Sequence, residues 1–254
     1  MLKGLVTAFR TLSIIPLPGK DASNLAASLP WFPVVGLTLG GIIYAIMRIL
    51  KFCSATPWPQ GCAIGGVVCA VILTKGLHLD GLSDWADGFI GGGWDKQKTL
   101  EVMKDPHSGV FGVISVVVIL LVKWVCYTRL MENGMPVWIV SAVIISRTMQ
   151  VESAATLPYA RSNDGTGAPF VRNARGIHRI IAVSCATGFL FLLNGIAGFF
   201  GLIVGWIVCG LFGLWCKKRI GGITGDTLGA CSEIVETVVL CAFTLAEIKA
   251  PSLL

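Results

Sequence analysis

Charged residues are scarce in this chain. Asp, Glu, Lys and Arg make up 13% of its 254 residues and hydrophobic residues make up 54%, whereas a soluble domain usually carries about a quarter charged residues. The mean hydropathy is +0.78. Such a composition argues against a soluble globular domain, and long apolar stretches recur from end to end. The sequence therefore predicts an all-α, polytopic membrane protein.

Several common functional motifs are also missing. The nine cysteines form no CxxC pair, which argues against a zinc site or a disulfide framework. Neither a GxxxxGK[ST] loop nor a GxGxxG fingerprint is present, so a P-loop or a dinucleotide fold is not indicated. No two aspartates are adjacent, as they would be in an aspartate-rich prenyltransferase. The net charge of +6 is interpreted as membrane topology, not as a nucleic-acid footprint.

Seven spanning helices are expected, with the tight turn between the fifth and sixth placed in Asn194–Gly201. The first fifteen residues are interrupted by Lys3 and Arg10, so we expect an interfacial or re-entrant segment there. No second soluble domain is visible, and residues 1–254 are treated as one integral membrane domain. The expected spans cover residues 31–50, 61–79, 109–127, 136–159, 180–197, 199–216 and 228–249.

This topology places the loops at 16–30, 80–108, 160–179 and 217–227 on one side. They carry eleven cations, against four in the loops of the other side, and the positive-inside rule assigns the first set to the cytoplasm. All eight aspartates fall on the same side. Because the positive-inside rule does not account for acids, this coincidence predicts a polar site at the cytoplasmic membrane surface, where acids of the second and seventh spans meet.

The stretch Thr74–Gly88, TKGLHLDGLSDWADG, is the main candidate for chemistry. If a helix continues through it, Asp80, Asp84 and Asp87 fall within a sector of roughly 60°. Three carboxylates so close together repel one another unless a cation screens them, and hard oxygen ligands indicate Mg²⁺. A solvated acidic helix end is the alternative. His78 is a candidate general base or a structural histidine.

Further candidate substrate-binding residues lie in later loops and spans. Basic residues and glycines at helix starts suit phosphate binding through side chains and backbone amides, although loop charge and helix capping explain some of them equally well. Arg147 and Glu152 lie at membrane depth, where each costs about 2.5–3.5 kcal/mol, so they should face a cavity or each other. Glu233 and Glu236, also inside a span, need a metal, a bound polar ligand or a partner such as Arg147. The full set is Lys104, Asp105, His107, Arg147, Arg161, Lys217, Lys218, Arg219, Gly222, Thr224, Gly225, Glu233 and Glu236, with Asp226 as a further candidate metal ligand.

Four motifs together carry a family resemblance. GLHLDGLSDWADG, KDPHSGVFG, YARSNDGTG and GGITGDTLGACSEIVE, in this order and at these distances, resemble the cobalamin synthase family. That family is also called adenosylcobinamide-GDP ribazoletransferase or cobalamin-5′-phosphate synthase. The resemblance covers nearly the whole chain, from about Leu2 to about Leu245.

The resemblance implies a Mg²⁺-dependent transferase of cobalamin biosynthesis, a multi-pass protein of the bacterial cell inner (cytoplasmic) membrane. The phosphocobinamide moiety of adenosylcobinamide-GDP passes to α-ribazole or α-ribazole 5′-phosphate, GMP leaves, and adenosylcobalamin or its 5′-phosphate forms. The resemblance further implies that Asp80, Asp84, Asp87 and Asp226 hold Mg²⁺. Arg161 and the basic cluster Lys217–Arg219 would stabilise charge on the phosphates, and His78 or an aspartate would act as the general base. The expected partners are the two substrates and the lipid bilayer, with no nucleic acid; a homo-oligomer or a complex with other nucleotide-loop assembly enzymes stays open.

Two rival functions remain. Another membrane transferase of diphosphate substrates, such as a CDP-alcohol phosphotransferase, would require an Ala-Arg pair in register after Asp80–Gly81, and there is none. A cation transporter would use Glu152, Glu233 and Glu236 as an intramembrane path. The gathering of the aspartates at one face favours surface chemistry over transport.

Overall fold

Helices make up nearly all of the regular structure in residues 2–161 and 165–246, the part of the chain that the computed structural model describes. One isolated β-bridge joins Tyr159 to Ile223. The prediction of an all-α protein is therefore confirmed. In chain order, with η marking short 3-10 or π turns, the helices are α1 (Leu2–Leu12), η1 (Leu25–Trp31), α2 (Phe32–Cys53), α3 (Pro59–Thr74), α4 (Leu77–Ala86), η2 (Asp87–Gly91), α5 (Lys96–Val102), α6 (Val110–Glu132), α7 (Val137–Thr156), α8 (Ala168–Arg172), α9 (Gly176–Asn194), η3 (Gly195–Ala197), α10 (Gly198–Ile220) and α11 (Gly225–Ala246).

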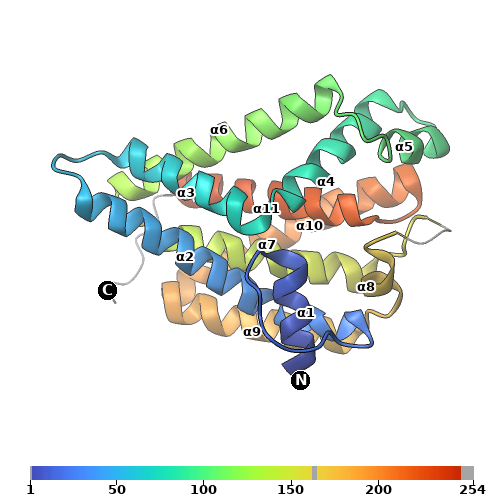
Figure 1. The fold of residues 1–254 in the computed structure, drawn as a ribbon, viewed down its shortest axis with the longest axis horizontal. Helices are drawn as coiled ribbons and strands as arrows, with labels where there is room; N and C mark the ends of the chain where they lie inside the picture. The colour runs from blue at the N-terminus through green and yellow to red at the C-terminus, as the bar shows by residue number, and fades with distance from the viewer. Residues whose placement is uncertain (1, 162–164, 247–254) are drawn as a thin grey trace.

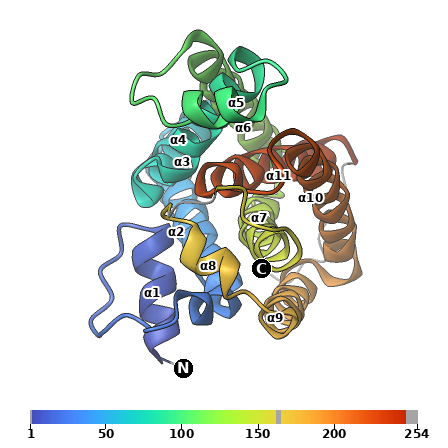
Figure 2. The same cartoon turned by 90° about the vertical axis from the view of Figure 1, so that its right-hand side faces the viewer.

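Helix α7 forms the centre of the bundle, as the view along the long axis shows (Figure 2). Every residue from Trp138 to Val151 is buried, and α2, α9, α10 and α11 pack around it. This enclosure explains how an inner helix can carry Ser146, Arg147 and Gln150, since polar side chains at membrane depth are tolerated where protein surrounds them.

The long axis of the molecule runs parallel to several helices that could cross a membrane (Figure 1). Four helical segments are long and apolar enough to do so, and α3 with α4 would make a fifth if the bent pair is counted as one span. The predicted number of seven is not confirmed. The four segments are Leu25–Cys53, Val110–Glu132, Gly176–Ile220 and Gly225–Ala246.

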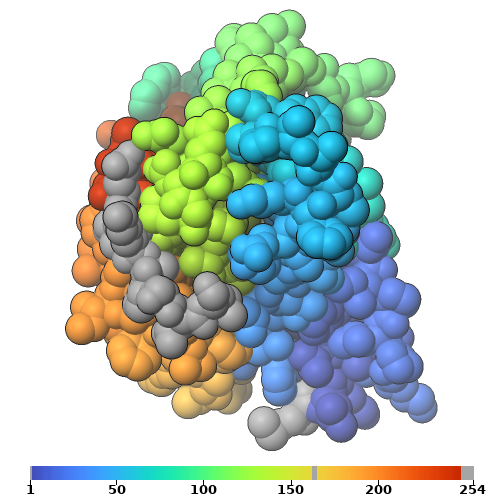
Figure 3. All heavy atoms as spheres, turned by 90° about the vertical axis from the view of Figure 1, so that its left-hand side faces the viewer, coloured from blue at the N-terminus to red at the C-terminus, as the bar shows by residue number. Residues whose placement is uncertain are grey.

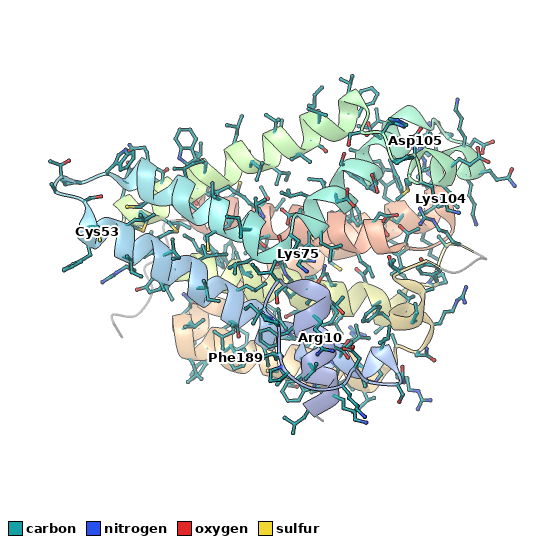
Figure 4. The ribbon with its side chains drawn as sticks, viewed as in Figure 1. Arg10, Cys53, Lys75, Lys104, Asp105 and Phe189 are labelled. Atoms are coloured by element: carbon teal, nitrogen blue, oxygen red, sulfur yellow. The ribbon has the colours of Figure 1, made fainter. Side chains whose placement is uncertain are left out.

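The predicted span over 61–79 is wrong as a continuous helix. Lys75 and Gly76 both adopt left-handed backbone conformations, with φ of 53° and 68°, and two such residues in succession end a right-handed helix. Helix α4 restarts at Leu77 and is bent by 89° from α3. Figure 4 shows Lys75 at this bend, near the middle of the molecule. The bend directs α4, with its aspartates, toward the right-hand end of Figure 1.

A second helix break lies where the sequence predicts a turn. Gly195, inside the expected Asn194–Gly201 turn, has φ of 61° and ends α9. The Ser141 hydroxyl on α7 donates a hydrogen bond to the Asn194 side chain. The 45-residue segment Gly176–Ile220 is thereby divided into α9 and α10, which pack against each other and against α7.

The polar connections gather at one end of the bundle. In Figure 1 the segments that contain α5 and α8 and the turn between α10 and α11 lie at the right-hand end. The α2–α3 connection lies at the opposite end, where Figure 3 shows it in cyan beside the yellow-green atoms around the start of α7. The 80–108, 160–179 and 217–227 loops were expected on one side, and the described parts of all three agree with that expectation.

Helix α1 stands across the bundle instead of along it (Figure 1). The segment that follows is tied back to it, because Arg10 pairs with Asp21 at 2.9 Å and the Thr7 hydroxyl donates to the same carboxylate at 3.0 Å. A helix in this orientation fits the interfacial segment expected at the N-terminus. Apolar side chains exposed along α6 and α10, such as Val117, Leu121 and Ile207, are suited to contact with lipid.

Candidate active site

Helices α4 and α11 cross at two glycines. A Cβ atom added at Gly81 would meet the backbone oxygen of Asp226 at 2.7 Å, and one added at Gly229 would meet the Cα of His78 at 3.3 Å. Small residues at a helix crossing allow the two backbones to touch. The close approach brings Asp80 and Asp84 of α4 beside Asp226 at the start of α11, as the sequence led us to expect.

Asp84 lies in a strongly negative environment. Its half-buried carboxylate is repelled by Asp80, Asp226 and Asp87 and attracted by Arg161. Asp80 is exposed, and no side-chain hydrogen bond or ion pair within residues 2–161 and 165–246 engages Asp80 or Asp84. These two carboxylates are therefore available to a cation or to a substrate.

The described residues contain no group of three or more His, Cys, Asp or Glu side chains already arranged to hold a metal ion. Mg²⁺ is commonly bound by one or two protein carboxylates together with substrate phosphates, not by an all-protein cage. The hard oxygen donors of Asp80 and Asp84, adjacent and unpaired, fit an ion that is shared with a diphosphate.

Asp226 is held between a cation and a hydroxyl. Its Oδ2 lies 3.1 Å from Nη2 of Arg161 and accepts a hydrogen bond of 3.3 Å from the Thr224 hydroxyl. Thr224 also caps α11, because its Oγ1 accepts from the N–H of Thr227 and its own N–H donates to the Thr227 hydroxyl. The Nε of Arg161 is buried and has no partner among the described groups. Arg161 thus keeps a donor for a further anion.

Backbone pairing aligns the two glycine-containing loops beside Asp226. The N–H of Ala160 donates to the oxygen of Ile223 at 2.8 Å, and the N–H of Ile223 donates to the oxygen of Pro158 at 2.9 Å. A Cβ at Gly222 would lie 2.1 Å from the Pro158 oxygen, and one at Gly167 would lie 2.9 Å from the Cα of Gly225. These glycines are needed for the close approach of the loops. Residues 162–164 of the YARSNDGTG motif lie outside the described residues.

Asp87, predicted as a metal ligand, contacts the start of α6. Its two carboxylate oxygens accept the backbone N–H groups of Gly109 and Gly112 at 2.7 and 2.8 Å. These are amide groups at the start of α6, where a carboxylate is favoured by the unpaired donors and the helix dipole. Asp87 therefore anchors α6 to the end of α4.

Arg147, Glu233 and Glu236 form an internal network in place of the substrate-binding site predicted for them. Lys123 of α6 donates to Glu233 and to Glu236, both at 2.7 Å, and Arg147 pairs with Glu236 at 3.0 Å. Arg147 also donates to Ser232 at 2.7 Å. All four ionisable side chains are buried. Arg147 is a partner of Glu236, as the sequence suggested, whereas Glu152 pairs with Arg179 instead of Arg147. The partner that could not be named from the sequence is Lys123.

Within the basic cluster at the end of α10, Arg219 lies apart from the two lysines. Arg219 is buried, donates to the backbone oxygens of Phe89 and Gly93, and stacks over the ring of Trp94 at 4.4 Å. It therefore holds the turn after η2. Lys217 and Lys218 are exposed, and Lys218 lies 5.9 Å from the centroid of the same tryptophan ring.

The loop before α6 places three predicted substrate-binding residues at the surface. Lys104, Asp105 and His107 are exposed and line neither of the cavities described below. The backbone N–H and ring of His107 hold the pKa of the Asp105 carboxyl below its usual value. Ser108, the next residue, lines the first of these cavities.

Two cavities meet at Asp80. The first, of about 620 Å³, lies between α1, α4 and α6 and includes Arg10, Lys75 and Ser108 in its wall. The second, of about 460 Å³, lies between α1, α4, α7 and α11 and is also bounded by the 166–170 segment. Thr11, Leu77 and Asp80 border both. In Figure 4, Arg10 and Lys75 lie near each other beside α1. Two ligands could therefore approach the carboxylates from different sides.

The glycine crossing provides a test of this geometry. Replacing Gly81 by Ala should lower turnover by about a hundredfold, because the new Cβ forces α4 away from Asp226 and a displacement of about 1 Å in an active site can cost that much. The measurement is steady-state product formation by purified protein. Gly91→Ala is the matched control, since a Cβ there meets nothing within 4 Å. Equal activity of both variants would show that the α4–α11 contact does not set the reacting geometry.

Comparison with known proteins identifies close relatives of the chain. The model of the cobalamin-5-phosphate synthase family matches residues 4–244. Proteins named adenosylcobinamide-GDP ribazoletransferase from Chlorobaculum parvum and Chlorobaculum tepidum are each 44% identical over 242 residues, which is 94% of this chain and 94% of each relative. The protein of the same name from Chlorobium phaeovibrioides is 42% identical over 261 residues, covering 97% of this chain and 98% of its own. No solved structure matches the chain.

Proposed function

This chain belongs to the cobalamin-5-phosphate synthase family, and we propose that it transfers the phosphocobinamide moiety of adenosylcobinamide-GDP to α-ribazole or its 5′-phosphate. Relatives that match nearly the full length of the chain are named adenosylcobinamide-GDP ribazoletransferase. The chain is accordingly a transferase of cobalamin biosynthesis. The observation that carries the proposed mechanism is the contact of α4 with α11, which unites Asp80, Asp84 and Asp226.

The reaction replaces a phosphoanhydride bond by a phosphate ester bond. A ribazole hydroxyl oxygen attacks the phosphorus that carries the cobinamide, the bond from this phosphorus to the bridging oxygen breaks, and GMP leaves with the electron pair. The hydroxyl proton passes to His78 or to one of the aspartates as general base. Arg161, which has an unpartnered buried Nε, stabilises charge on the phosphate oxygens.

We further propose that Asp80 and Asp84 hold Mg²⁺ together with the donor diphosphate, with Asp226 and Arg161 adjacent. When bound, the ion would neutralise charge on the bridging and leaving oxygens. The fit rests on the oxygen donors and on the mutual repulsion of the carboxylates. Asp87 is assigned to the start of α6 because both of its oxygens already accept amide hydrogens.

The transporter alternative finds little support in the positions of the intramembrane acids. Glu152 pairs with Arg179 at 2.6 Å, while Glu233 and Glu236 are closed off by Lys123 and Arg147. Acids paired in this way do not form an open ion path. The several apolar helices support a membrane protein. We propose the bacterial inner membrane, with the end that carries α5 and α8 facing the cytoplasm, because the positive-inside rule favours that side.

The function is tested by GMP release. Purified protein in detergent or nanodiscs should release GMP from adenosylcobinamide-GDP when α-ribazole or its 5′-phosphate is present, and one cobalamin product should form for each GMP. Chelation of divalent cations should stop turnover and Mg²⁺ should restore it. Absence of GMP release with both acceptors would contradict the function, whereas full activity in chelator would contradict the proposed metal alone.

A further inference from the structure

The second cavity contains buried polar atoms that no described residue satisfies. His78 and Gln150 are only 2% and 4% exposed and both line this cavity. The two ring nitrogens of His78 and the Oε1 of Gln150 have no hydrogen-bond partner in the described part of the chain. Gln150 is oriented by its other terminal atom, Nε2, which donates to the oxygen of Leu228 at 3.3 Å. Because buried polar groups are almost always paired, these atoms indicate a ligand that completes them.

The rest of the wall is largely apolar and aromatic. Leu12 of α1, Leu29 of η1 and Phe32 of α2 face it together with Phe170 of α8. The rings of Phe32 and Phe170 lie 6.5 Å apart at a tilt of 56°. A flat apolar molecule with a few polar atoms suits such a wall, since apolar contacts supply affinity and a small number of polar groups fix orientation. A volume of about 460 Å³ is in the range of small-molecule sites.

The two cavities differ in charge. The first carries Arg10 and Lys75, cations that favour a diphosphate. Among the described residues that line the second cavity there is no Lys or Arg, although the cavity reaches Asp80 and Asp226, and the nearby Arg161 is paired with Asp226. A neutral aromatic riboside therefore matches the second cavity better than a nucleoside diphosphate does.

The position of His78, one of the candidate general bases, favours the same assignment. A base must lie within hydrogen-bond reach of the hydroxyl that it deprotonates. His78 borders the second cavity and does not border the first. With His78 as the base, the acceptor hydroxyl enters from the second cavity, whereas Asp80 borders both cavities and does not distinguish between them.

We propose that the second cavity is the acceptor subsite and that the first cavity receives the diphosphate donor, an assignment that rests on the proposed function. The aromatic base of ribazole lies among Leu29, Phe32 and Phe170. A donor group of the acceptor, such as a ribose hydroxyl, bonds to Oε1 of Gln150, and the ribose extends toward Asp80 and Asp226. Gln150 is thus a substrate-binding residue that neither the acidic motif nor the glycine loops contain.

The test separates the two substrates kinetically. Gln150→Met keeps the size of the side chain and removes the acceptor oxygen, and Ala154→Leu extends a side chain of the cavity wall into the space. In full-length protein both should raise KM for α-ribazole, the neutral acceptor, by about tenfold, with KM for adenosylcobinamide-GDP changed less than twofold. Ser153→Ala is the matched control, because Ser153 is a buried polar residue of the same helix that contacts Cys209 and does not line the cavity.

A binding measurement keeps the test independent of turnover. Calorimetric titration of the purified protein with α-ribazole alone should show about tenfold weaker binding to Gln150→Met than to the wild type and to Ser153→Ala. If the wild type releases GMP but both cavity variants keep the acceptor KM, or raise the donor KM instead, the subsite assignment is overturned and the proposed function stands. If the wild type releases no GMP with either acceptor, the proposed function fails first.

Discussion

Asp84→Asn should lose at least about three orders of magnitude in turnover while the protein remains folded and inserted. Asp84 carries no partner of its own among the described side chains and is surrounded by Asp80, Asp226 and Asp87. Its carboxylate is therefore the group best placed to hold a cation against a diphosphate. Loss of one electrostatic contact to the transition state commonly costs a factor of 10² to 10³, and weakened metal binding adds to that. The assay is GMP release at saturating concentrations of both substrates and Mg²⁺.

Two controls accompany this variant. Glu101→Gln makes the same change of charge on exposed α5 and should keep wild-type turnover. Thermal unfolding should show that Asp84→Asn is at least as stable as the wild type, because one negative charge has been removed from a repulsive cluster. Near-normal, Mg²⁺-dependent turnover of Asp84→Asn would remove this aspartate from the site.

Lys123→Met should destabilise the protein by about 3–5 kcal/mol, the cost expected when one partner of a buried ion pair is deleted. Lys123 is 5% exposed and is the cation that bridges Glu233 and Glu236. Without it Glu233 loses its only ion-pair partner among the described residues. Since whole domains are stable by about 5–15 kcal/mol, the loss should appear as a clear fall in the unfolding midpoint in detergent.

The double variant Lys123→Met/Glu233→Gln separates pairing from packing. Removing one glutamate charge should recover part of the lost stability, because the uncompensated buried charge is the main cost. Lys51→Met, on the exposed end of α2, should leave the midpoint unchanged. A midpoint of Lys123→Met equal to that of the wild type would show that the network contributes little to stability.

The sequence predicts the helical class and the meeting of α4 with α11 because those features follow from composition and motif spacing. The proximity of Asp80 and Asp226 could be predicted because both residues lie at expected helix ends on one side of the membrane. The break at Lys75–Gly76 could not be foreseen in the same way, because a non-glycine residue with φ of 53° is held there by its surroundings, which local sequence does not encode.

Charged residues whose partners are distant in the chain were the hardest to assign from the sequence. Arg219 was grouped with Lys217 and Lys218 by adjacency, yet it alone turns inward to the oxygens of Phe89 and Gly93. Lys123 stands alone in an apolar helix, and that isolation was a usable signal, since an ionisable residue at membrane depth needs a partner or a function. Gln150 gave no such signal, because its role depends on a cavity whose wall combines helices from distant parts of the chain.

Cation binding in the presence of the donor is the most direct test of a metal site formed by the α4 carboxylates and the donor diphosphate. Mn²⁺, used as a paramagnetic substitute for Mg²⁺, would be titrated into purified wild type and Asp84→Asn by electron paramagnetic resonance with adenosylcobinamide-GDP bound. We expect one or more Mn²⁺ sites that are at least tenfold weaker in Asp84→Asn and that weaken in the wild type when the donor is withheld. Equal Mn²⁺ affinity in both proteins would contradict a carboxylate site shared between α4, a metal ion and the donor diphosphate.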